Sequence, residues 1–397
     1  MSHTDDILGI NDLIIEKTKK HKHIDIWAKP ANRPRCKYCD SEHVVIKASH
    51  RKTIKHSRQG NQLMLLHLKT PKYHCKTCRR YFTHQFTGVL PRFRASETFK
   101  LEVFEAHHEG VSQRKLSQTH AISSSTVERW YQAHIQQKYA EKDRGNCPTI
   151  LGIDEHFFTR KQGYATTFVD LKNHKVFDVQ LGRSEASLGQ YLQGLQGREH
   201  VQIVVIDLSK TYRSIVKKYF PNATIVADRF HVVRLVNYHF LKAWKLQDPD
   251  GRQNRKLLSL MRYHQWQLSP SKHRTLMDYL AQFPVLEALY LAKQRLMRFI
   301  LLRTVKAKRM QTLLPDFLGL LTQIKHSPLN GLAKTISSWM EPILAMWRYS
   351  KNNGITEGFH TKMEMLSRRA YGFRNFQNYR LRVITHCGWD GIINRVR

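Results

Sequence analysis

The sequence predicts a multidomain protein in which a small cysteine-containing β segment and a helical segment precede an α/β domain with an all-α insertion. Three observations predict this order. Two Cys-x-x-Cys pairs lie in the N-terminal part of the chain and enclose strand-like segments. From about 95 to 140 the apolar residues follow helical spacing. From 149 to 230 apolar strands alternate with helices, and from about 231 to 350 the pattern is almost entirely helical.

The net charge narrows the class of partner. The 397 residues include 66 Lys and Arg against 31 Asp and Glu, which gives a formal net charge of +35. Such a chain attracts polyanions, either nucleic acid or an anionic membrane surface. The sequence has no run of about 18 apolar residues and no signal-peptide pattern. We therefore expect a nucleic-acid partner, no membrane, and a cytoplasmic, nucleoid-associated location, although composition alone also fits an RNA- or ribosome-associated protein.

The two cysteine pairs have the pattern of a structural zinc site. Each pair supplies two ligands from one tight turn, and two pairs complete the tetrahedral set of four that zinc prefers. Four protein ligands leave no open position for water, so the site is expected to be structural. The alternatives are two redox dithiols or a chance spacing. The four predicted ligands are Cys36, Cys39, Cys75 and Cys78.

The segment between the cysteine pairs is expected to be a zinc ribbon built from short strands. Residues 44–47 and 63–68 are the strand candidates, and 59–61 reads as a turn. The 35 residues between the pairs exceed the usual ribbon spacing, and the intervening strands accommodate them. His67 and His74 are alternative ligands that two complete cysteine pairs make unnecessary.

Three helices are predicted next, in the pattern of a helix-turn-helix. They cover 95–109, 112–120 and 123–131, with Ser123 as a cap for the third helix. A short helix, a short turn and a helix that begins with small polar residues is how a recognition helix enters the major groove of DNA. An ordinary three-helix bundle with solvated polar faces is the alternative. The residues expected to contact DNA here are Arg114, Lys115, Ser124, Ser125 and Arg129.

The α/β region has an order of elements that points to one fold. A strand at 149–155 is followed by two strands that form an antiparallel meander, and then by helix, strand, helix and strand. This is the order of the ribonuclease-H fold, in which the first and fourth strands lie side by side. The first strand leads to Asp154 and the fourth, at 201–207, ends at Asp207. We therefore expect the two carboxylates to meet.

Two neighbouring carboxylates require cations, because like charges repel and their burial is costly. Oxygen ligands favour Mg²⁺ or Mn²⁺, and two such ions support phosphoryl transfer. A third acid is expected from a late helix, where Glu357 lies in the first turn after an Asn353-Gly354 turn, with Thr356 as a cap. The structural alternative is that an aspartate at the end of a strand caps the following turn.

Two further predictions concern residues near these acids. Asp228 ends the fifth strand, and it either positions groups around the metal ions or caps a helix that begins at His231. The sequence leaves both roles open. Further basic residues on the late helix are expected to grip the DNA backbone. They are Lys362, Arg368 and Arg369.

These motifs in this order resemble the ISL-three family of bacterial insertion-sequence transposases. The resemblance covers nearly the whole chain. It is carried by the two cysteine pairs, the helix-turn-helix, Gly152-Ile153-Asp154-Glu155, Asp207 with its strand, Asp228-Arg229-Phe230-His231, Asn353-Gly354-x-x-Glu357-Gly358, and Tyr371-Gly372-Phe373-Arg374-Asn375-Phe376. The sequence departs from the family pattern at His360, where we expect Asn, and at Glu364, where a basic residue is common.

The resemblance implies a DDE triad of Asp154, Asp207 and Glu357 that uses two Mg²⁺ or Mn²⁺ ions per active site. It also implies binding at terminal inverted repeats and a helical insertion before the acid-bearing helix. Because two transposon ends must be brought together and joined to target DNA, a homodimer on double-stranded DNA is expected. Two alternatives remain: a domesticated DNA-binding regulator that no longer cuts, and a structure-specific nuclease or resolvase of the same fold.

These predictions divide the chain into four segments with soft borders, since no low-complexity linker separates them. A short amphipathic lead-in occupies 1–30, the zinc ribbon 31–90, and the helix-turn-helix 91–145. The ribonuclease-H-like catalytic domain occupies 146–397, with the helical insertion at about 231–350.

Overall fold

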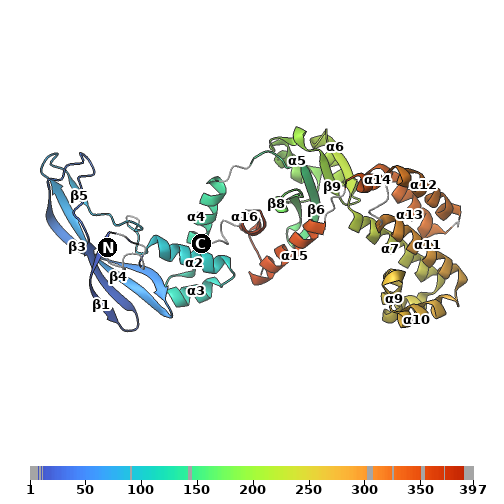
Figure 1. The fold of residues 1–397 in the computed structure, drawn as a ribbon, viewed down its shortest axis with the longest axis horizontal. Coiled ribbons are helices and arrows are strands. Elements are labelled where there is room, and N and C mark those ends of the chain that lie inside the picture. Colours follow the sequence, from blue (N-terminus) through green and yellow to red (C-terminus); the bar gives the residue numbers. More distant parts are fainter. Residues whose placement is uncertain are drawn as a thin grey trace. The chain divides into compact units, whose positions relative to one another are not determined.

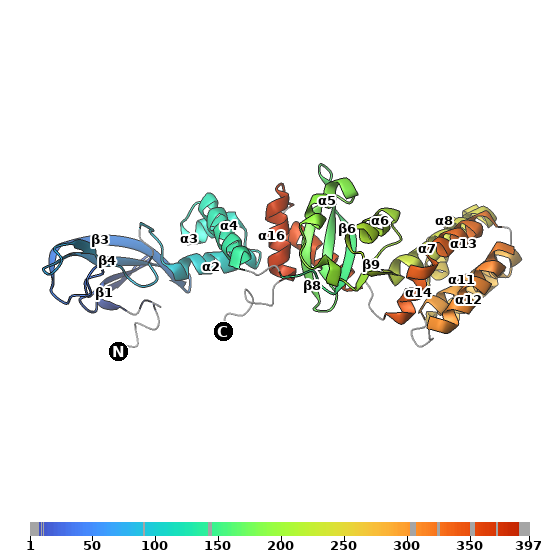
Figure 2. The same cartoon turned by 90° about the horizontal axis from the view of Figure 1, so that it is seen from above.

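The computed structural model describes residues 8, 10, 12–89, 92–141, 145–301, 307–323, 326–349, 354–370 and 372–388. The chain divides into two compact units, residues 1–142 and 143–397 (Figures 1 and 2). Within the described residues, none of the helices combines the length and apolar character needed to span a bilayer.

The first unit contains a five-stranded sheet in the order β1-β2-β4-β3, with the short β5 also paired to β4. β2 and β4 are parallel and the other pairs are antiparallel. The strands are β1 (Leu13–Lys20), β2 (Ile24–Pro30), β3 (Val44–Gln59), β4 (Gln62–Cys75) and β5 (Tyr81–Thr83).

The segment expected to be a lead-in contains β1 and β2 of this sheet. Ile26 and Ala28 are buried and alternate with more exposed neighbours, which is the period of a half-buried strand. β3 and β4 are also longer than predicted. They form one hairpin around Gly60, whose φ of 59° gives the left-handed backbone that the predicted turn requires.

The described residues of the first unit also include the helices α2 (Glu97–His108), α3 (Gln113–His120) and α4 (Ser124–Glu141). Each begins after a serine whose side chain accepts a backbone N–H of the first turn. Ser123 caps α4 in this way, as predicted. A core that includes Phe99, Val103 and Val127 packs against Leu63 of β4, so the helices rest on the long hairpin.

The second unit is built on a five-stranded sheet in the order β10-β9-β6-β7-β8. β6, β7 and β8 form an antiparallel meander, whereas β9 and β10 are parallel to β6. The first and fourth strands of this unit are therefore neighbours, as expected. The strands are β6 (Ile150–Thr159), β7 (Gly163–Asp170), β8 (Lys175–Leu181), β9 (Ile203–Ile206) and β10 (Thr224–Ala227).

Consecutive buried residues along β7 and β9 indicate that both faces of this sheet are covered. α5 (Glu185–Gln193) packs on β8, and α6 (Lys210–Tyr219) packs on β9. α15 (Gly354–Arg369) contacts β6, and α16 (Phe376–Cys387) contacts β8. The short 3₁₀ helix η1 (Arg198–His200) precedes β9.

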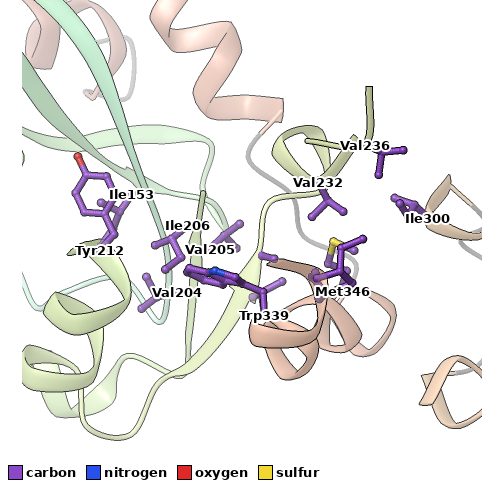
Figure 3. Packing of buried hydrophobic residues seen from close by; sticks show 14 of the residues in the cluster. Ile153, Val204, Val205, Ile206, Tyr212, Val232, Val236, Ile300, Trp339 and Met346 are labelled. Carbon is purple, nitrogen blue, oxygen red and sulfur yellow. The ribbon is translucent and has the colours of Figure 1, made fainter. Parts of the chain in front are cut away.

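The described residues between β10 and α15 are mostly helical, as predicted. Their elements are α7 (Arg229–Gln247), α8 (Pro249–Gln253), α9 (Arg255–Arg262), η2 (Gln265–Gln267), α10 (Pro270–Leu280), α11 (Pro284–Leu301), α12 (Ala307–Gln323), α13 (Ser327–Ser338) and α14 (Met340–Arg348). α14 returns to pack on β10. One buried apolar cluster joins sheet and insertion: Ile153 and Val205 belong to it, as do Trp339 and Met346 (Figure 3).

Candidate functional site

The four cysteines of the first unit converge on one point. Their sulfur atoms all lie within 4.8 Å of one another. The Sγ atoms of Cys36 and Cys78 are 3.6 Å apart, and those of Cys39 and Cys75 are 3.7 Å apart. A tetrahedron with zinc–sulfur bonds of about 2.3 Å has edges of about 3.8 Å. The cluster therefore has the size and the ligand set of a structural zinc site.

The two cysteine pairs adopt the same local turn, which explains why they can face one another. The N–H of Asp40 donates to the carbonyl of Cys36 at 2.8 Å, and the N–H of Arg79 donates to the carbonyl of Cys75 at 2.9 Å. Asp40 and Arg79 both have left-handed backbones, with φ of 54° and 59°. The backbone N–H groups of Cys78 and Thr77 lower the pKa of Cys75 to about 6, which favours the thiolate that zinc binds.

The two histidines considered as alternative ligands have other partners. His67 hydrogen-bonds Asp25 at 2.7 Å and stacks on Trp27, with ring centroids 4.7 Å apart. His74 packs against Tyr81 at a centroid distance of 4.6 Å. Neither is a member of the cysteine cluster.

In the second unit, three aspartates are brought into register at one end of the parallel strands. Ile153 of β6 pairs with Ile206 of β9, so Asp154 and Asp207 occupy the next position on adjacent strands. The N–H of Asp228 donates to the carbonyl of Ile206 at 2.7 Å, which places Asp228 beside Asp207 at the end of β10. β6 continues to Thr159, so Asp154 lies where the pairing with β9 stops rather than at the strand's own end.

Burial and mutual repulsion make these carboxylates hard to ionise. Burial raises the pKa of Asp154 to about 6; the negative charges of Asp207 and Asp228 act in the same direction and the nearby His231 opposes them. Burial also raises the pKa of Asp207, with a further contribution from Asp228. Groups of this kind are stabilised by a cation. Among the described residues, however, the cysteines alone form a set of three or more ligand atoms within 4.8 Å.

Glu357 lies in the first turn of α15, and its side chain is exposed. The same helix passes Asp154: His360, one turn after Glu357, has its Nδ1 atom 3.9 Å from Oδ2 of Asp154. α15 begins at Gly354, so Thr356 is a buried residue inside the first turn and not the predicted cap. Asn353 of the predicted turn lies outside the described residues.

Asp228 caps a helix, which is one of the two roles that the sequence left open. Its side chain accepts the N–H of Phe230 at 3.3 Å and caps α7, which begins at Arg229, two residues before the predicted start. Its Oδ2 atom also lies 3.6 Å from Nε2 of His231, and its charge acts on both Asp154 and Asp207. Asp228 is 2% exposed, so this charge is held close to the other two acids.

Comparison with known proteins identifies the family. The sequence profile of the ISL-three (ISL3) DDE transposases, described as Transposase, matches residues 151–383, which is more than half of the chain. The chain belongs to the ISL-three family of transposases. The matched region contains the three in-register aspartates, the helical insertion and α15 with Glu357.

Curated relatives agree with this family. The transposase for insertion sequence element IS1001 of Bordetella parapertussis is 25% identical over 270 residues, which span 65% of each chain. The transposase for insertion sequence element IS1557 of Mycobacterium tuberculosis is 24% identical over 257 residues, or 57% of each chain. The chain thus matches less than two thirds of the length of these relatives.

Sequence reasoning missed a polar network that ties α15 and α16 to the sheet. His156 of β6 hydrogen-bonds Thr167 of β7 at 3.0 Å and the hydroxyl of Tyr379 on α16 at 2.8 Å. His360 of α15 hydrogen-bonds the same Thr167 at 3.2 Å. Burial lowers the pKa of His156 to about 3 and that of His360 to about 4, so both rings are neutral near pH 7. The departure from the ISL-three pattern at His360 was the one available signal.

The residues predicted to contact DNA are almost all accessible. On α3 and α4, four of the five are exposed and Ser124 is half-buried; the exposed four are Arg114, Lys115, Ser125 and Arg129. On α15, Lys362 and Arg369 are exposed, and Arg368 forms an exposed ion pair with Glu364 at 2.7 Å. Glu364, the second departure from the family pattern, therefore pairs with Arg368, which is one of the residues predicted to contact phosphate.

Proposed function

We propose that this chain is the transposase of an insertion sequence, which binds the element's terminal inverted repeats and catalyses metal-dependent cleavage and transfer of DNA strands. One observation carries the proposal. Within the region that matches the family, Asp154 and Asp207 occupy equivalent positions on adjacent parallel strands; Asp154 is buried and Asp207 half-buried, and both have raised pKa values. Residues with perturbed pKa values cluster at functional sites, and a bound cation would offset the repulsion between the two carboxylates.

The proposed catalytic domain is ribonuclease-H-like. The strand order β10-β9-β6-β7-β8 supports this assignment. In the centre of the sheet, β9 is parallel to β6 and β7 is antiparallel to it. The sheet places the first and fourth strands side by side, which is the feature that brings two acids from distant segments to one point. α15 contacts β6, so it can deliver a third acid from the side.

We assign Asp154, Asp207 and Glu357 as the ligands of two Mg²⁺ or Mn²⁺ ions. The donor set fits such ions, because all three residues offer carboxylate oxygens and Asp154 and Asp207 occupy neighbouring positions on adjacent strands. When bound, the ions supply an activated oxygen nucleophile and charge stabilisation for phosphoryl transfer. Asp228 and His231 flank this site. We propose that Asp228 orients His231 and adds a negative charge beside Asp154 and Asp207.

DNA recognition is assigned to the first unit. We propose that the cysteine cluster binds one structural zinc ion and that α3 and α4 act as a helix-turn-helix with α4 as the recognition helix. The exposed Ser125 and Arg129 lie one turn apart on α4, as expected for side chains that enter a groove. Because two element ends have to be joined, we propose that a homodimer acts on the paired ends and the target duplex.

A DNA-binding regulator that no longer cuts is the alternative, and one experiment separates the two. Purified full-length protein is incubated with a labelled duplex that carries its own element's end, with and without Mg²⁺. The proposed function predicts specific binding in both cases and strand cleavage at the element boundary with Mg²⁺ alone. Specific binding without cleavage in Mg²⁺ or Mn²⁺ would instead favour the regulator, and cleavage of branched DNA without preference for the end would favour a structure-specific nuclease.

A further inference from the structure

The first unit contains an open groove of about 1230 Å³ between the connector that enters α2 and the side of α4. We call it the junction groove. The connector contributes Arg92, Phe93 and Arg94 to one wall. This wall is held in place by β3, because the N–H of Lys55 donates to the carbonyl of Arg94 and the N–H of Ser96 donates to the carbonyl of Lys55, both at 2.9 Å.

The opposite wall continues the proposed recognition face of α4. Arg129, Ala133 and Gln137 line the groove and are spaced by four residues, so they lie on one side of the helix. Ser125 precedes Arg129 by the same interval. The groove therefore adjoins the face of α4 that is expected to contact DNA.

The charge of the junction groove is strongly positive. Its described lining includes Lys55, Arg92, Arg94, Lys100 and Arg129, against Glu97 as the one acidic residue of that lining. Among the described residues no ion pair is formed by any of the three arginines. Two of the lining cations hydrogen-bond uncharged groups. Lys55 donates to the carbonyl of Ala121, and Arg129 donates to the hydroxyl of Thr126 at 3.4 Å.

An aromatic surface adjoins these cations. The ammonium group of Lys100 lies 3.4 Å from the ring centre of Phe93, which is 42% exposed, and 5.7 Å from that of Trp130. Burial lowers the pKa of Lys100, because its surroundings do not fully replace water. An anion placed in the groove would offset this cost. A small anion would leave most of the groove empty, whereas a polyanion would meet all of its cations.

We propose that the junction groove binds the phosphate backbone of duplex DNA next to the segment read by α4, with Arg92, Arg94 and Lys100 as phosphate contacts. Duplex DNA carries one negative charge per about 1.7 Å, so a groove with several cations can be filled by consecutive phosphates. The connector would act as an anchored arm that extends the contact surface of a short recognition helix. This inference rests on the proposed function in taking α4 as the recognition helix and the bound duplex as the element's end.

The test compares two double variants of the full-length, zinc-loaded protein. Arg92→Gln/Arg94→Gln removes two cations from the groove, and Lys47→Gln/Arg51→Gln removes two exposed cations from β3 outside it. Both lose the same net charge. Fluorescence anisotropy measures affinity for the end duplex over a series of salt concentrations. Zinc content and thermal melting equal to those of the wild type establish that each variant is folded.

The groove variant is expected to bind more weakly and to reduce the slope of log affinity against log salt by about 1.8, since each B-DNA phosphate contact contributes about 0.9. The β3 variant is expected to leave the slope nearly unchanged. An unchanged slope in the groove variant, or an equal loss in the β3 variant, would overturn the proposal. The same titrations on a scrambled duplex distinguish a failure of the groove proposal from a failure of the proposed function. If the wild type shows no preference for its end, the proposed function fails, while the slopes still decide the groove.

Discussion

The cysteine cluster and the carboxylate site organise ligands in opposite ways. In the cysteine cluster, two short turns of the same shape hold all four sulfur atoms within 4.8 Å. In the carboxylate site, sheet register aligns Asp154 with Asp207, whereas Glu357 comes from a separate helix and is exposed. Two local turns and one hairpin therefore assemble the first set, while the second depends on three distant segments.

The difference follows from the charge of the ligands and suits the two proposed purposes. Neutral thiols can approach one another before metal binds, and backbone N–H groups favour the thiolate at Cys75. Carboxylates repel, so buried ones stay protonated or apart until a cation arrives. A permanent zinc site benefits from a preformed cluster. A catalytic site whose ions and DNA arrive together is better served by ligands that close around them.

The largest expected effect tests the preformed cluster. Replacing Cys36 by Ser removes one of four zinc ligands, so zinc content should fall from about one per chain to near zero and the fold around the cluster should be lost. Structural zinc contributes roughly 10–16 kcal/mol in small zinc-finger peptides. Metal analysis and circular dichroism measure the two effects. Cys147→Ala, in the core of the second unit, is the matched control and should keep its zinc. A Cys36→Ser protein with full zinc would show that the site is held by other ligands.

The second prediction tests repulsion in the carboxylate site of metal-free protein. Burial raises the pKa of Asp154 from 3.8 to about 6, so the ionised side chain destabilises the fold at pH values above about 6 and not below about 4. Asp154→Asn should therefore raise the free energy of unfolding by roughly 3 kcal/mol near pH 7.5 and leave it little changed near pH 4.

Urea denaturation at the two pH values measures this difference. Asp316→Asn replaces an exposed carboxylate of α12 and serves as the control that should change stability at neither pH. Adding Mg²⁺ or Mn²⁺ should stabilise the wild type more than the Asn variant. If Asp154→Asn destabilises the protein equally at both pH values, the carboxylate is a structural group and the repulsion has been misassigned.

A smaller effect is expected from the network that holds α16 and α15 on the sheet. Tyr379→Phe removes the hydroxyl that hydrogen-bonds Nε2 of His156 and leaves this buried nitrogen without that partner. The free energy of unfolding should fall by about 1–2 kcal/mol. Tyr238→Phe, on the exposed side of α7, is the control that should have no effect. Equal stability of the Tyr379→Phe protein and the wild type would mean that water replaces the hydroxyl and that the network does not anchor the helix.

What could be predicted from the sequence depended on how local each signal was. The cysteine pairs lie at the ends of a single hairpin, and the apolar strands that lead to Asp154 and Asp207 show in short runs of residues. β1 was missed because its second half is polar and exposed, so it shows no alternation, and β2 because its alternation covers only a few residues. The hydrogen bond between His156 and Tyr379 joins residues 223 positions apart, and no local pattern indicates it.

The central claim is that Asp154, Asp207 and Glu357 act together as the catalytic acids, with Asp228 as a supporting residue. Glu357→Gln and Asp228→Asn test it most directly, because each keeps the size of the side chain and removes its charge. Both proteins are assayed for cleavage of a labelled transposon end in Mg²⁺ and in Mn²⁺, and for binding of the same DNA by gel shift.

Glu357→Gln should abolish cleavage and joining while binding remains at the wild-type level. Asp228→Asn should retain measurable cleavage, reduced because His231 loses the carboxylate 3.6 Å from its Nε2 atom. Asp154→Asn provides the reference for a dead site. An active Glu357→Gln protein, together with an Asp228→Asn protein as inactive as Asp154→Asn, would contradict the assignment and make the three in-register aspartates the catalytic set.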